Sequence, residues 1–505
     1  MTLVEMLKRN ATLHPEKTAM VSGETKVSYK TFYERTNALG NYLVHIGLEK
    51  GQRVGLLLQK TPEVIISFLG AATAGGIVFP IDYNQTLANI QFILDLTDPS
   101  VLIVDESYKS MLSKLQLPCS DEKIIMVGRK SDNTHKTLDE IFQNELHDDP
   151  HVFIENNDIV YLNFTSGTTG RPKGAITTHA NIYWNTLSAI ESLNLTHDDV
   201  HLCMFPVFSH PHELFARPLY LGGTIVLTDS ISPKSIAKVI SEHRVTCMMA
   251  VASIYDTLVR IYDSSYFDFS SLRMLESGGM HMNPTLVKKL KECFHVSVIP
   301  VWGSTETSGI AVATPIDHPY RAGSMGKSCP YYEVQILSED GEEMPPNEIG
   351  EMAVKGPGVC SGYYNQPDET DKCLKDGYFL TGDMVRKNSD GYLYFASRKA
   401  GMMKVAGLKV SPTEIEDVLI DHPDIAEVAV VKTLDHSHGE VPRAVIVPKV
   451  GMNINKADIR KFCEERLSRY KVPRVIEFRT ELPKGPGGKI LYRQLWLGYK
   501  ENPDF

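Results

Sequence analysis

The chain has 505 residues, more than the roughly 100 to 200 of an ordinary domain, so we expect two or more domains. Hydrophobic residues make up 42% and charged residues 23%, which excludes disordered and fibrous proteins. The formal net charge is −10 and Lys and Arg form no long runs, so nucleic acid is not expected as the main partner. A phosphate-bearing ligand would need local backbone amides, a few placed cations and a metal.

Redox state and cellular location are predicted from cysteine usage and the N-terminal segment. Eight cysteines are scattered without a C-x-x-C pair or a Cys/His metal spacing, so we expect isolated reduced thiols. The segment MTLVEMLKRN lacks the basic start and apolar stretch of a secretory signal, which favours a cytoplasmic protein. The longest uncharged stretch, Val64 to Pro80, is interrupted by glycines and falls short of the ~20 residues that a bilayer needs. It predicts a core helix followed by a strand, and no transmembrane segment.

Helix-like and strand-like segments alternate over residues 26 to 160 and again from about 200 to 310. TFYERTNALGNYLVHIG and PEVIISFLGAATAGG are helix-like, whereas RVGLLL, SVLIVD, VTCMMAV and SVIPVWG are strand-like. The alternation predicts α/β units around a largely parallel sheet. From about residue 330, short runs with Gly, Pro and Asp-Gly predict an antiparallel sheet or a small barrel.

After Arg398 the sequence predicts a compact α/β module. A capping box of Ser411 and Glu414, with Pro412 in the first turn, should open a helix over 412 to 421. The strands EVAVVK and RAVIVPK follow. A second helix is expected where four apolar side chains share one face: Ile459, Phe462, Cys463 and Leu467.

A string of Ser, Thr and Gly follows an expected strand, Ile159 to Phe164. It consists of Thr165, Ser166, Gly167, Thr168, Thr169, Gly170, Arg171, Pro172, Lys173 and Gly174. Hydroxyls, glycine amides and one lysine are what a mobile loop needs to wrap a polyphosphate. It is not a Walker A loop, because Arg171 follows Gly170 where that loop has a lysine. A plain turn is the alternative, but the full string favours a phosphate loop.

Two further strings carry groups that suit a nucleotide. In SVIPVWGSTETSG, the indole of Trp302 can stack on a purine, a hydroxyl can reach a phosphate, and the carboxylate of Glu306 can hold Mg²⁺. In DGYFLTGD, Asp383 can accept hydrogen bonds from both ribose hydroxyls. Taken singly, Glu306 also fits a capping residue at a strand end, and Asp383 a turn residue.

These strings, followed in order by SRKAGMMKVAGLKVSPTEIE and LPKGPGGKILYRQL, resemble the adenylate-forming superfamily of acyl-CoA synthetases, adenylation domains and beetle luciferases. The resemblance covers nearly the whole chain. It implies an α/β fold with a large N-terminal ATP- and acid-binding domain over 1–397, built of αβ-layered subdomains and a small β-barrel-like part. A small, mobile α+β C-terminal domain over 398–505 would carry the catalytic lysine.

The resemblance implies that a carboxylate attacks the α-phosphate of ATP, that pyrophosphate leaves, and that a thiol then captures the acyl-adenylate. Lys489 would lie between the carboxylate and the α-phosphate, Thr305 would contact the α-phosphate, and Glu306 would hold Mg²⁺. The loop from Thr165 to Lys173 would close over the β- and γ-phosphates. The implied adenine and ribose residues are Gly279, Trp302, Gly303, Asp383 and Arg398, with Trp302 at a position that is usually Tyr.

The small domain is expected to deliver Lys489 in one pose and a thiol tunnel in another. Lys404, Ala406 and Gly407 would line this tunnel, with Gly407 allowing close backbone approach. The sequence departs from the family at the pivot, because Ala400 and Gly401 stand where a hinge Asp or Lys is usual. We expect this departure to affect the rate at which the small domain alternates between its two poses, whereas no reacting charge is lost.

The acid pocket is expected along Phe208 to Phe215, Ser277 to His281 and the residues beside Trp302. Its predicted members are Phe208, His210, His212, Ser277, Gly278 and Ser308. Ser209 stands where relatives often have His, and His210, His212 and His281 are expected as wall or structural residues rather than as an acid or base. Glu213 is the one acidic residue in this stretch that could pair with a substrate ammonium, and it lies too far along the chain from Phe208.

We therefore expect a CoA ligase that acts on a fatty or aromatic acid, with ATP, Mg²⁺ and CoA as cofactor and co-substrates. A ligase that loads a separate carrier protein is the alternative, and a luciferase-like oxidase or a non-catalytic nucleotide-binding regulator ranks lower. The identity of the acid and the oligomeric state stay open.

Overall fold

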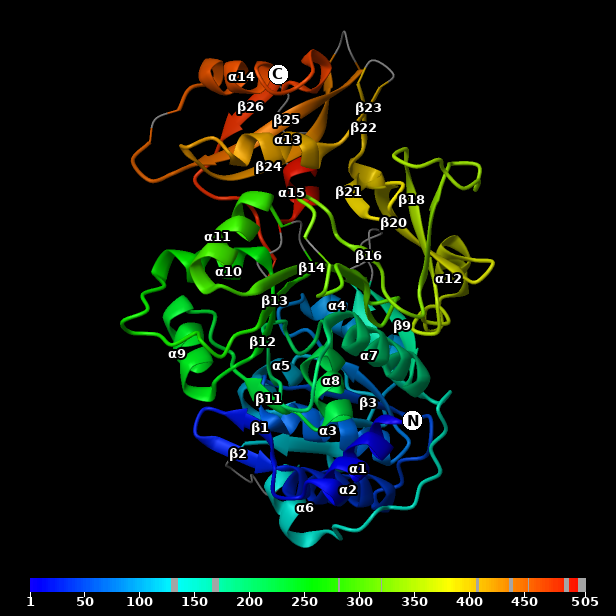
Figure 1. Cartoon of the computed structure of the whole chain (residues 1–505). Helices are drawn as coiled ribbons and strands as arrows, with labels where there is room; N and C mark the ends of the chain where they lie inside the picture. The colour runs from blue at the N-terminus through cyan, green and yellow to red at the C-terminus, as the bar shows by residue number, and fades with distance from the viewer. Residues whose placement is uncertain are drawn as a thin grey trace.

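The computed structural model describes residues 1–128, 135–165, 172–279, 282–318, 320–405, 408–435, 439–452, 454–485 and 490–497. Two large sheets with their helices form the main body, an antiparallel sheet lies at its side, and a small module of strands and helices lies at the top of the view (Figure 1). None of the helices in these residues has the length and apolarity needed to span a bilayer.

A seven-stranded sheet contains the strands between residues 53 and 178, in the order β7-β6-β5-β3-β4-β8-β9. All neighbours are parallel except β8 and β9, which are antiparallel. The strands are β3 (Arg53–Leu57), β4 (Ile77–Pro80), β5 (Val101–Asp105), β6 (Ile124–Val127), β7 (Lys136–Thr137), β8 (Ile159–Thr165) and β9 (Lys173–Thr178). The strand predicted at Ile159–Phe164 is confirmed as β8.

The helices of this first part show why the sheet is buried. They are α1 (Leu3–Leu13), α2 (Tyr29–His45), α3 (Pro62–Thr73), α4 (Leu87–Thr97), α5 (Lys109–Leu112) and α6 (Leu138–Asn144). Every residue of α3 from Val64 onward is buried, as expected of a helix that is apolar on all sides. The stretch Val64 to Pro80 is thus the predicted core helix followed by a strand, β4.

A nine-stranded sheet has the order β16-β15-β14-β13-β12-β10-β11-β1-β2. The strands from β14 to β1 in this order are parallel, and antiparallel strands close both edges. The strands are β1 (Thr18–Ser22), β2 (Thr25–Ser28), β10 (Val200–Cys203), β11 (Thr224–Leu227), β12 (Cys247–Ala250), β13 (Met274–Ser277), β14 (Ser297–Ser304), β15 (Gly309–Ala313) and β16 (Lys327–Ser328). The helices are α7 (His179–Leu193), α8 (Ala216–Leu221), α9 (Pro233–His243), α10 (Ala252–Ile261) and α11 (Pro284–Phe294), with the 3₁₀ helix η3 (Pro211–Leu214).

The antiparallel part predicted after residue 330 is a five-stranded sheet with one helix. Its elements are β17 (Glu333–Leu337), β18 (Ile349–Lys355), α12 (Pro367–Cys373), β19 (Leu374–Lys375), β20 (Tyr378–Lys387) and β21 (Leu393–Arg398). After η4 (Lys399–Gly401) the small module contains β22 (Met403–Val405), β23 (Leu408–Val410), α13 (Pro412–Ile420), β24 (Ile425–Asp435), β25 (Gly439–Pro448), α14 (Lys456–Glu464), β26 (Val475–Phe478) and α15 (Tyr492–Leu497).

The small module has cores of its own. A cluster that runs from Met403 to Ile476 shares no residue with the main core, which ends at Leu393. The module's first helix begins as predicted, with Ser411 Oγ accepting from the Glu414 amide at 3.4 Å. The capping box was wrong in its second half, because the Glu414 carboxylate pairs with Lys471 at 2.7 Å instead of returning to the Ser411 amide.

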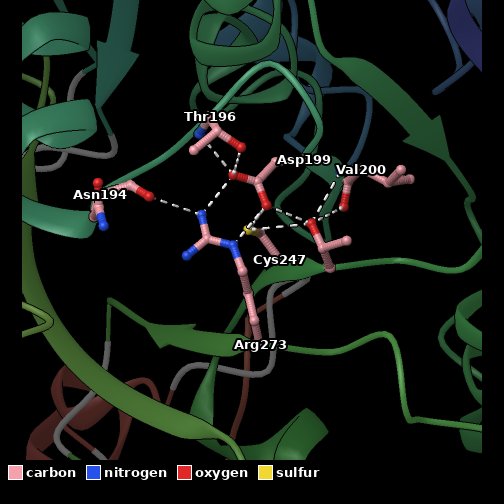
Figure 2. A network of polar contacts seen from close by, with 7 residues as sticks. Asn194, Thr196, Asp199, Val200, Cys247 and Arg273 are labelled. Atoms are coloured by element: carbon pink, nitrogen blue, oxygen red, sulfur yellow. Dashed lines mark hydrogen bonds and ion pairs between the residues drawn. The ribbon is translucent and has the colours of Figure 1, made fainter.

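A partly buried ion pair ties the amino ends of three neighbouring strands (Figure 2). Arg273, just before β13, donates Nε to Oδ1 of Asp199 at 2.6 Å and Nη2 to Oδ2 at 2.5 Å. Thr246, just before β12, donates its hydroxyl to Oδ1 at 2.7 Å. Asp199 precedes β10 and is only 2% exposed. Burial raises its pKa, but the hydrogen bonds and charge of Arg273 outweigh this and hold the pKa well below its usual range.

Replacement of Asp199 by Asn should destabilise the main body, because it leaves the Arg273 guanidinium without its buried counter-charge. We expect a loss of about 2–4 kcal/mol in the free energy of unfolding. The neighbouring Asp198→Asn is the matched control, since the Asp198 side chain is 83% exposed. Urea unfolding of both variants at neutral pH measures the effect, and equal midpoints would contradict this role of the pair.

Candidate active site

The predicted phosphate loop is closed at its base by two strands. Thr165 ends β8 and pairs with Lys173, the first residue of β9. The backbone of β9 also bonds to the segment that precedes α12, because Tyr364 donates its amide to Gly174 O at 2.8 Å. Six predicted loop residues lie outside the described residues: Ser166, Gly167, Thr168, Thr169, Gly170 and Arg171.

Lys173 has an acidic partner on α12. Its ammonium pairs with Glu369 and lies 5.4 Å from the centre of the Tyr363 ring. Glu369 also pairs with Lys372. The hydrogen bond from Lys173, followed by that from Lys372, holds the pKa of Glu369 below its usual range. Lys173 is therefore held at the base of the loop by its ion pair with Glu369.

Glu306 lies in the turn after β14 and is held by the same segment. Tyr363 donates its hydroxyl to Glu306 Oε1 at 2.7 Å, and the Cys360 amide donates to Glu306 O at 2.8 Å. Burial is the main cause that raises the pKa of Tyr363, so its hydroxyl stays protonated and acts as the donor. Tyr363 was not among the predicted site residues, because no local motif marks a tyrosine whose partner carboxylate is 57 residues away in the sequence.

Trp302, Asp383 and Arg398 are brought together as expected for one subsite. Trp302 Nε1 donates to Asp383 Oδ2 at 2.8 Å, and Arg398 Nε lies 2.9 Å from Oδ1. Asp383 on β20 and Arg398 on β21 are cross-strand partners. The carboxylate of Asp383 is 2% exposed, whereas the Arg398 side chain is 57% exposed. The geometry gives a buried carboxylate that accepts a hydrogen bond from Trp302 of one sheet and forms an ion pair with Arg398 of another.

The turn between Trp302 and Glu306 is built by close backbone contacts. A Cβ at Gly303 would lie 2.3 Å from Gly309 O, so only glycine fits there. The amide of Ser304 donates to the Thr307 hydroxyl at 2.9 Å, which fixes the turn that carries Thr305. Gly279, predicted at the adenine, follows β13 with φ +76°, a left-handed conformation that favours glycine.

His212 and Ser308 of the predicted acid pocket are in contact. His212 Nε2 donates to Ser308 O at 2.9 Å, and Nδ1 accepts from the Tyr161 hydroxyl at 2.7 Å. These partners define a neutral imidazole with its proton on Nε2. Burial lowers the pKa of His212 to about 4. Both ring nitrogens are engaged, so His212 supports the wall of the site and has no free nitrogen for acid–base chemistry.

The other predicted pocket residues lie at the carboxyl ends of β10 and β13. Phe208 meets the Tyr83 ring edge-on at a centroid distance of 5.2 Å. His210 lies 6.3 Å, centroid to centroid, from Phe205. Ser277 ends β13 and is buried, and a Cβ at Gly278 would lie 3.1 Å from a Val301 methyl group.

Glu213 is engaged in a buried charge cluster. Arg217 Nη2 donates to Glu213 Oε2 at 2.6 Å, and its Nη1 donates to Glu276 Oε2 at 2.7 Å. All three side chains are at most 5% exposed. Burial raises the pKa of Glu276. Glu213 is thus paired within the chain, in accord with its rejection as a partner for a substrate ammonium.

Three predicted groups lie outside the described residues: Lys489, the tunnel pair Ala406 and Gly407, and His281. Lys404 is described and lies on β22, where its amide donates to Glu440 Oε2 at 2.8 Å. Among the described residues, no group of three or more His, Cys, Asp or Glu side chains is arranged to hold a metal ion. A cation at Glu306 would therefore take most of its ligands from elsewhere, such as phosphate oxygens.

Stability should fall below neutral pH because buried His212 resists protonation. The pKa of His212 is about 4 in the folded protein, below the ~6.5 of an imidazole in the unfolded chain. The contribution of His212 to the free energy of unfolding is therefore complete above pH ~6.5 and is lost as the pH falls toward 4. His212→Gln keeps a donor and an acceptor without titrating. The free energy of unfolding of the His212→Gln variant should therefore vary less with pH than that of the wild type. The difference in slope should reach ~1.4 kcal/mol per pH unit between about pH 6 and 4.5.

Urea unfolding across this pH range measures the slope for wild type and variant. His197→Gln is the control, because the His197 side chain is 68% exposed and its replacement should leave the slope unchanged. A slope in His212→Gln that equals that of the wild type would contradict a buried neutral imidazole.

Comparison with known proteins places the chain in a family. The model described as AMP-binding enzyme matches residues 7–364, and that of the AMP-binding enzyme C-terminal domain matches residues 414–489. An indoleacetate–CoA ligase of Aromatoleum aromaticum is 30% identical over 97% of this chain and 96% of its own length. A long-chain-fatty-acid–CoA ligase of Bacillus subtilis is 31% identical over 99% and 95%.

Comparison with solved structures agrees with this family assignment. The anthranilate CoA ligase AuaEII in complex with anthranoyl-AMP superposes with a TM-score of 0.92 at 28% identity, covering 99% of this chain and 97% of that chain. The match confirms the predicted fold class, a large N-terminal domain and a small C-terminal domain. The chain belongs to the AMP-binding enzymes of the adenylate-forming superfamily.

Proposed function

We propose that this protein is an AMP-forming acid–thiol ligase that joins a fatty or aromatic carboxylic acid to AMP with release of pyrophosphate and then transfers the acyl group to CoA. The relatives named as CoA ligases, which match nearly the full length of the chain, support both the reaction and the acceptor. A cytoplasmic location is part of the proposal, and eight cysteines without a disulfide are in keeping with it.

One observation carries the proposal: a continuous path of contacts joins the predicted nucleotide groups. It begins at Arg398, passes to Asp383 and on to Trp302. After the turn at Gly303 it continues from Glu306 to Tyr363 and ends at Lys173. The order along the path is ribose, base, metal and phosphate-loop groups. A carboxylate that can hold a metal, together with a phosphate-loop lysine, would stabilise the charge that develops during adenylation.

Each group has a role in keeping with its surroundings. Trp302 would stack on adenine, and the buried Asp383 would accept hydrogen bonds from the ribose. Thr305, which is 8% exposed in the turn, would donate to the α-phosphate. Lys173, which contacts Glu369 and the Tyr363 ring, would contact the outer phosphates as the loop closes. These contacts would hold the anionic phosphates in place while the carboxylate approaches.

The residues present fit a magnesium ion. Glu306 keeps one carboxylate oxygen, Oε1, on Tyr363, and its second oxygen is not part of that bond. One carboxylate together with phosphate oxygens is a usual ligand set for Mg²⁺, which would neutralise phosphate charge when bound. Tyr363 would fix the direction in which Glu306 presents its oxygen.

We place the boundary between the domains at residues 397 and 398. Arg398 ends β21, and η4 with Ala400 and Gly401 leads into the separate core that begins at Met403. Rotation about this segment would deliver Lys489 for adenylation and Lys404, Ala406 and Gly407 for thiol transfer. In the present pose, Thr285 donates its hydroxyl to Asp421 of the small domain at 3.0 Å.

Lys489 is expected to stabilise the charge that develops between carboxylate and α-phosphate. Lys489→Ala should lower acid-dependent ATP–pyrophosphate exchange by at least about 100-fold and leave ATP binding nearly unchanged. Lys484→Ala is the matched control, because Lys484 lies five residues earlier and pairs with Glu427 at 2.7 Å. Near-normal exchange in Lys489→Ala would overturn the assigned role.

Acid class and acceptor can be tested together. Pyrophosphate exchange would be measured on a panel of fatty, aryl and dicarboxylic acids, and AMP release would then be followed with and without CoA. We expect exchange with one fatty or aryl class and at least about tenfold faster AMP release with CoA. Exchange that CoA leaves unaffected would instead indicate a separate carrier protein as acceptor, and no exchange with any acid would contradict the proposed activity.

A further inference from the structure

The hydroxyl of Ser308 is buried and has no hydrogen-bond partner among the described residues of the chain. Ser308 is 0% exposed and lies in the turn between β14 and β15. A buried hydroxyl without a partner is unfavourable, because it has given up its hydrogen bonds to water, and most such groups in folded proteins are satisfied. Since Ser308 is also a predicted member of the acid pocket, its hydroxyl is a candidate contact for the acid.

The turn that carries Ser308 is held by hydrogen bonds to its carbonyl groups. Ser308 has φ +51°, a left-handed conformation that is uncommon for residues other than glycine. His212 Nε2 donates to Ser308 O at 2.9 Å, and Tyr332 donates its hydroxyl to Thr307 O at 2.7 Å. The Thr307 hydroxyl donates to Gly309 O at 2.7 Å. This strained turn is therefore held in place without the Ser308 hydroxyl.

A cluster of charged side chains lies beside this turn. A Cβ at Gly309 would lie 2.3 Å from Glu213 Oε1, so the Glu213 carboxylate packs against the residue that follows Ser308. Arg217 joins Glu213 to Glu276. Because the cluster has two carboxylates and one guanidinium, it favours a neighbouring group that donates a hydrogen bond over another carboxylate. An alkyl chain would gain little there, because the cluster offers charged rather than apolar surface.

Another part of the predicted pocket is aromatic. The Phe208 ring meets the Tyr83 ring edge-on at a centroid distance of 5.2 Å. The Phe205 ring lies 3.7 Å from the position that a Cβ at Gly278 would take, so glycine leaves room beside this ring. Aromatic rings pack well against other rings in edge-on or offset arrangements. These surfaces suit a flat aromatic acid.

We propose that the Ser308 hydroxyl determines which acid is used: it forms a hydrogen bond with a hydroxyl or uncharged amino substituent on the ring of an aromatic acid. The enzyme should therefore prefer such an acid to the unsubstituted aromatic acid and to unbranched fatty acids. The proposal rests on the proposed function, which supplies the reaction, and it narrows the class of acid. The Glu213–Arg217–Glu276 cluster would disfavour an acid with a second carboxylate.

The test measures kcat/KM for ATP–pyrophosphate exchange with benzoate, the ortho, meta and para isomers of hydroxybenzoate and aminobenzoate, hexanoate and palmitate. The wild type should use at least one substituted isomer about tenfold better than benzoate, as expected for one hydrogen bond. In Ser308→Ala this ratio should fall about tenfold. Ser67→Ala is the matched control and should keep the wild-type ratio. Ser67 is likewise a buried serine without a hydrogen-bond partner among the described residues, and it lies on the core helix α3.

A second variant, Ser308→Gly, decides the matter if Ser308→Ala does not fold, because glycine adopts a left-handed φ without strain. It also lacks the hydroxyl and should show the same fall in the ratio. A wild-type ratio in either variant would overturn the proposal, as would a wild-type enzyme that uses benzoate, hexanoate or palmitate at least as well as every substituted isomer. Absence of exchange with all of these acids and with dicarboxylic acids would instead contradict the proposed function.

Discussion

The bidentate pair between Arg273 and Asp199 fixes the amino ends of β10, β12 and β13, and the rest of the main body depends on that alignment. Parallel strands direct all their carboxyl ends to one edge, so strands aligned at the start present their following loops together. The segment Met204–Phe215 and the residues after Ser277 and Ser304 all leave from that opposite edge. A constraint on the strand starts thus determines where the predicted acid and nucleotide groups emerge.

The predicted nucleotide groups come from three sheets and meet through side-chain bonds. Trp302 connects the nine-stranded sheet to Asp383 of the antiparallel sheet. Tyr363, in the segment before α12, connects Glu306 to Lys173 of the seven-stranded sheet. These bonds are few and partly buried, so they hold while water is excluded and can rearrange when a charged ligand brings new partners.

Much of the fold was predictable because apolar periodicity is a local property: β8, α3 and the helix that starts at Pro412 lie where the pattern indicated. Trp302, Asp383 and Arg398, which the resemblance grouped, are in mutual contact, whereas their roles at adenine and ribose stay predictions. The second half of the Glu414 capping box was wrong, because Lys471 is a competing partner that is distant in sequence. Tyr363, Glu369 and the Glu213–Arg217–Glu276 cluster were missed for the same reason, since their contacts are tertiary and leave no local pattern.

The position of the Arg273–Asp199 pair at the strand starts has a consequence for how such a protein can diverge. Its contribution to stability lies at the edge away from the loops that would receive the acid, so substitutions in those loops leave this anchor intact. A protein in which the stabilising pair and the ligand-binding loops lie at opposite edges of the sheet can accept mutations that change which ligand shapes fit, and these mutations leave the stabilising pair in place. Relatives about 30% identical that are named as ligases of indoleacetate and of long-chain fatty acids illustrate how far one architecture can vary its chemistry.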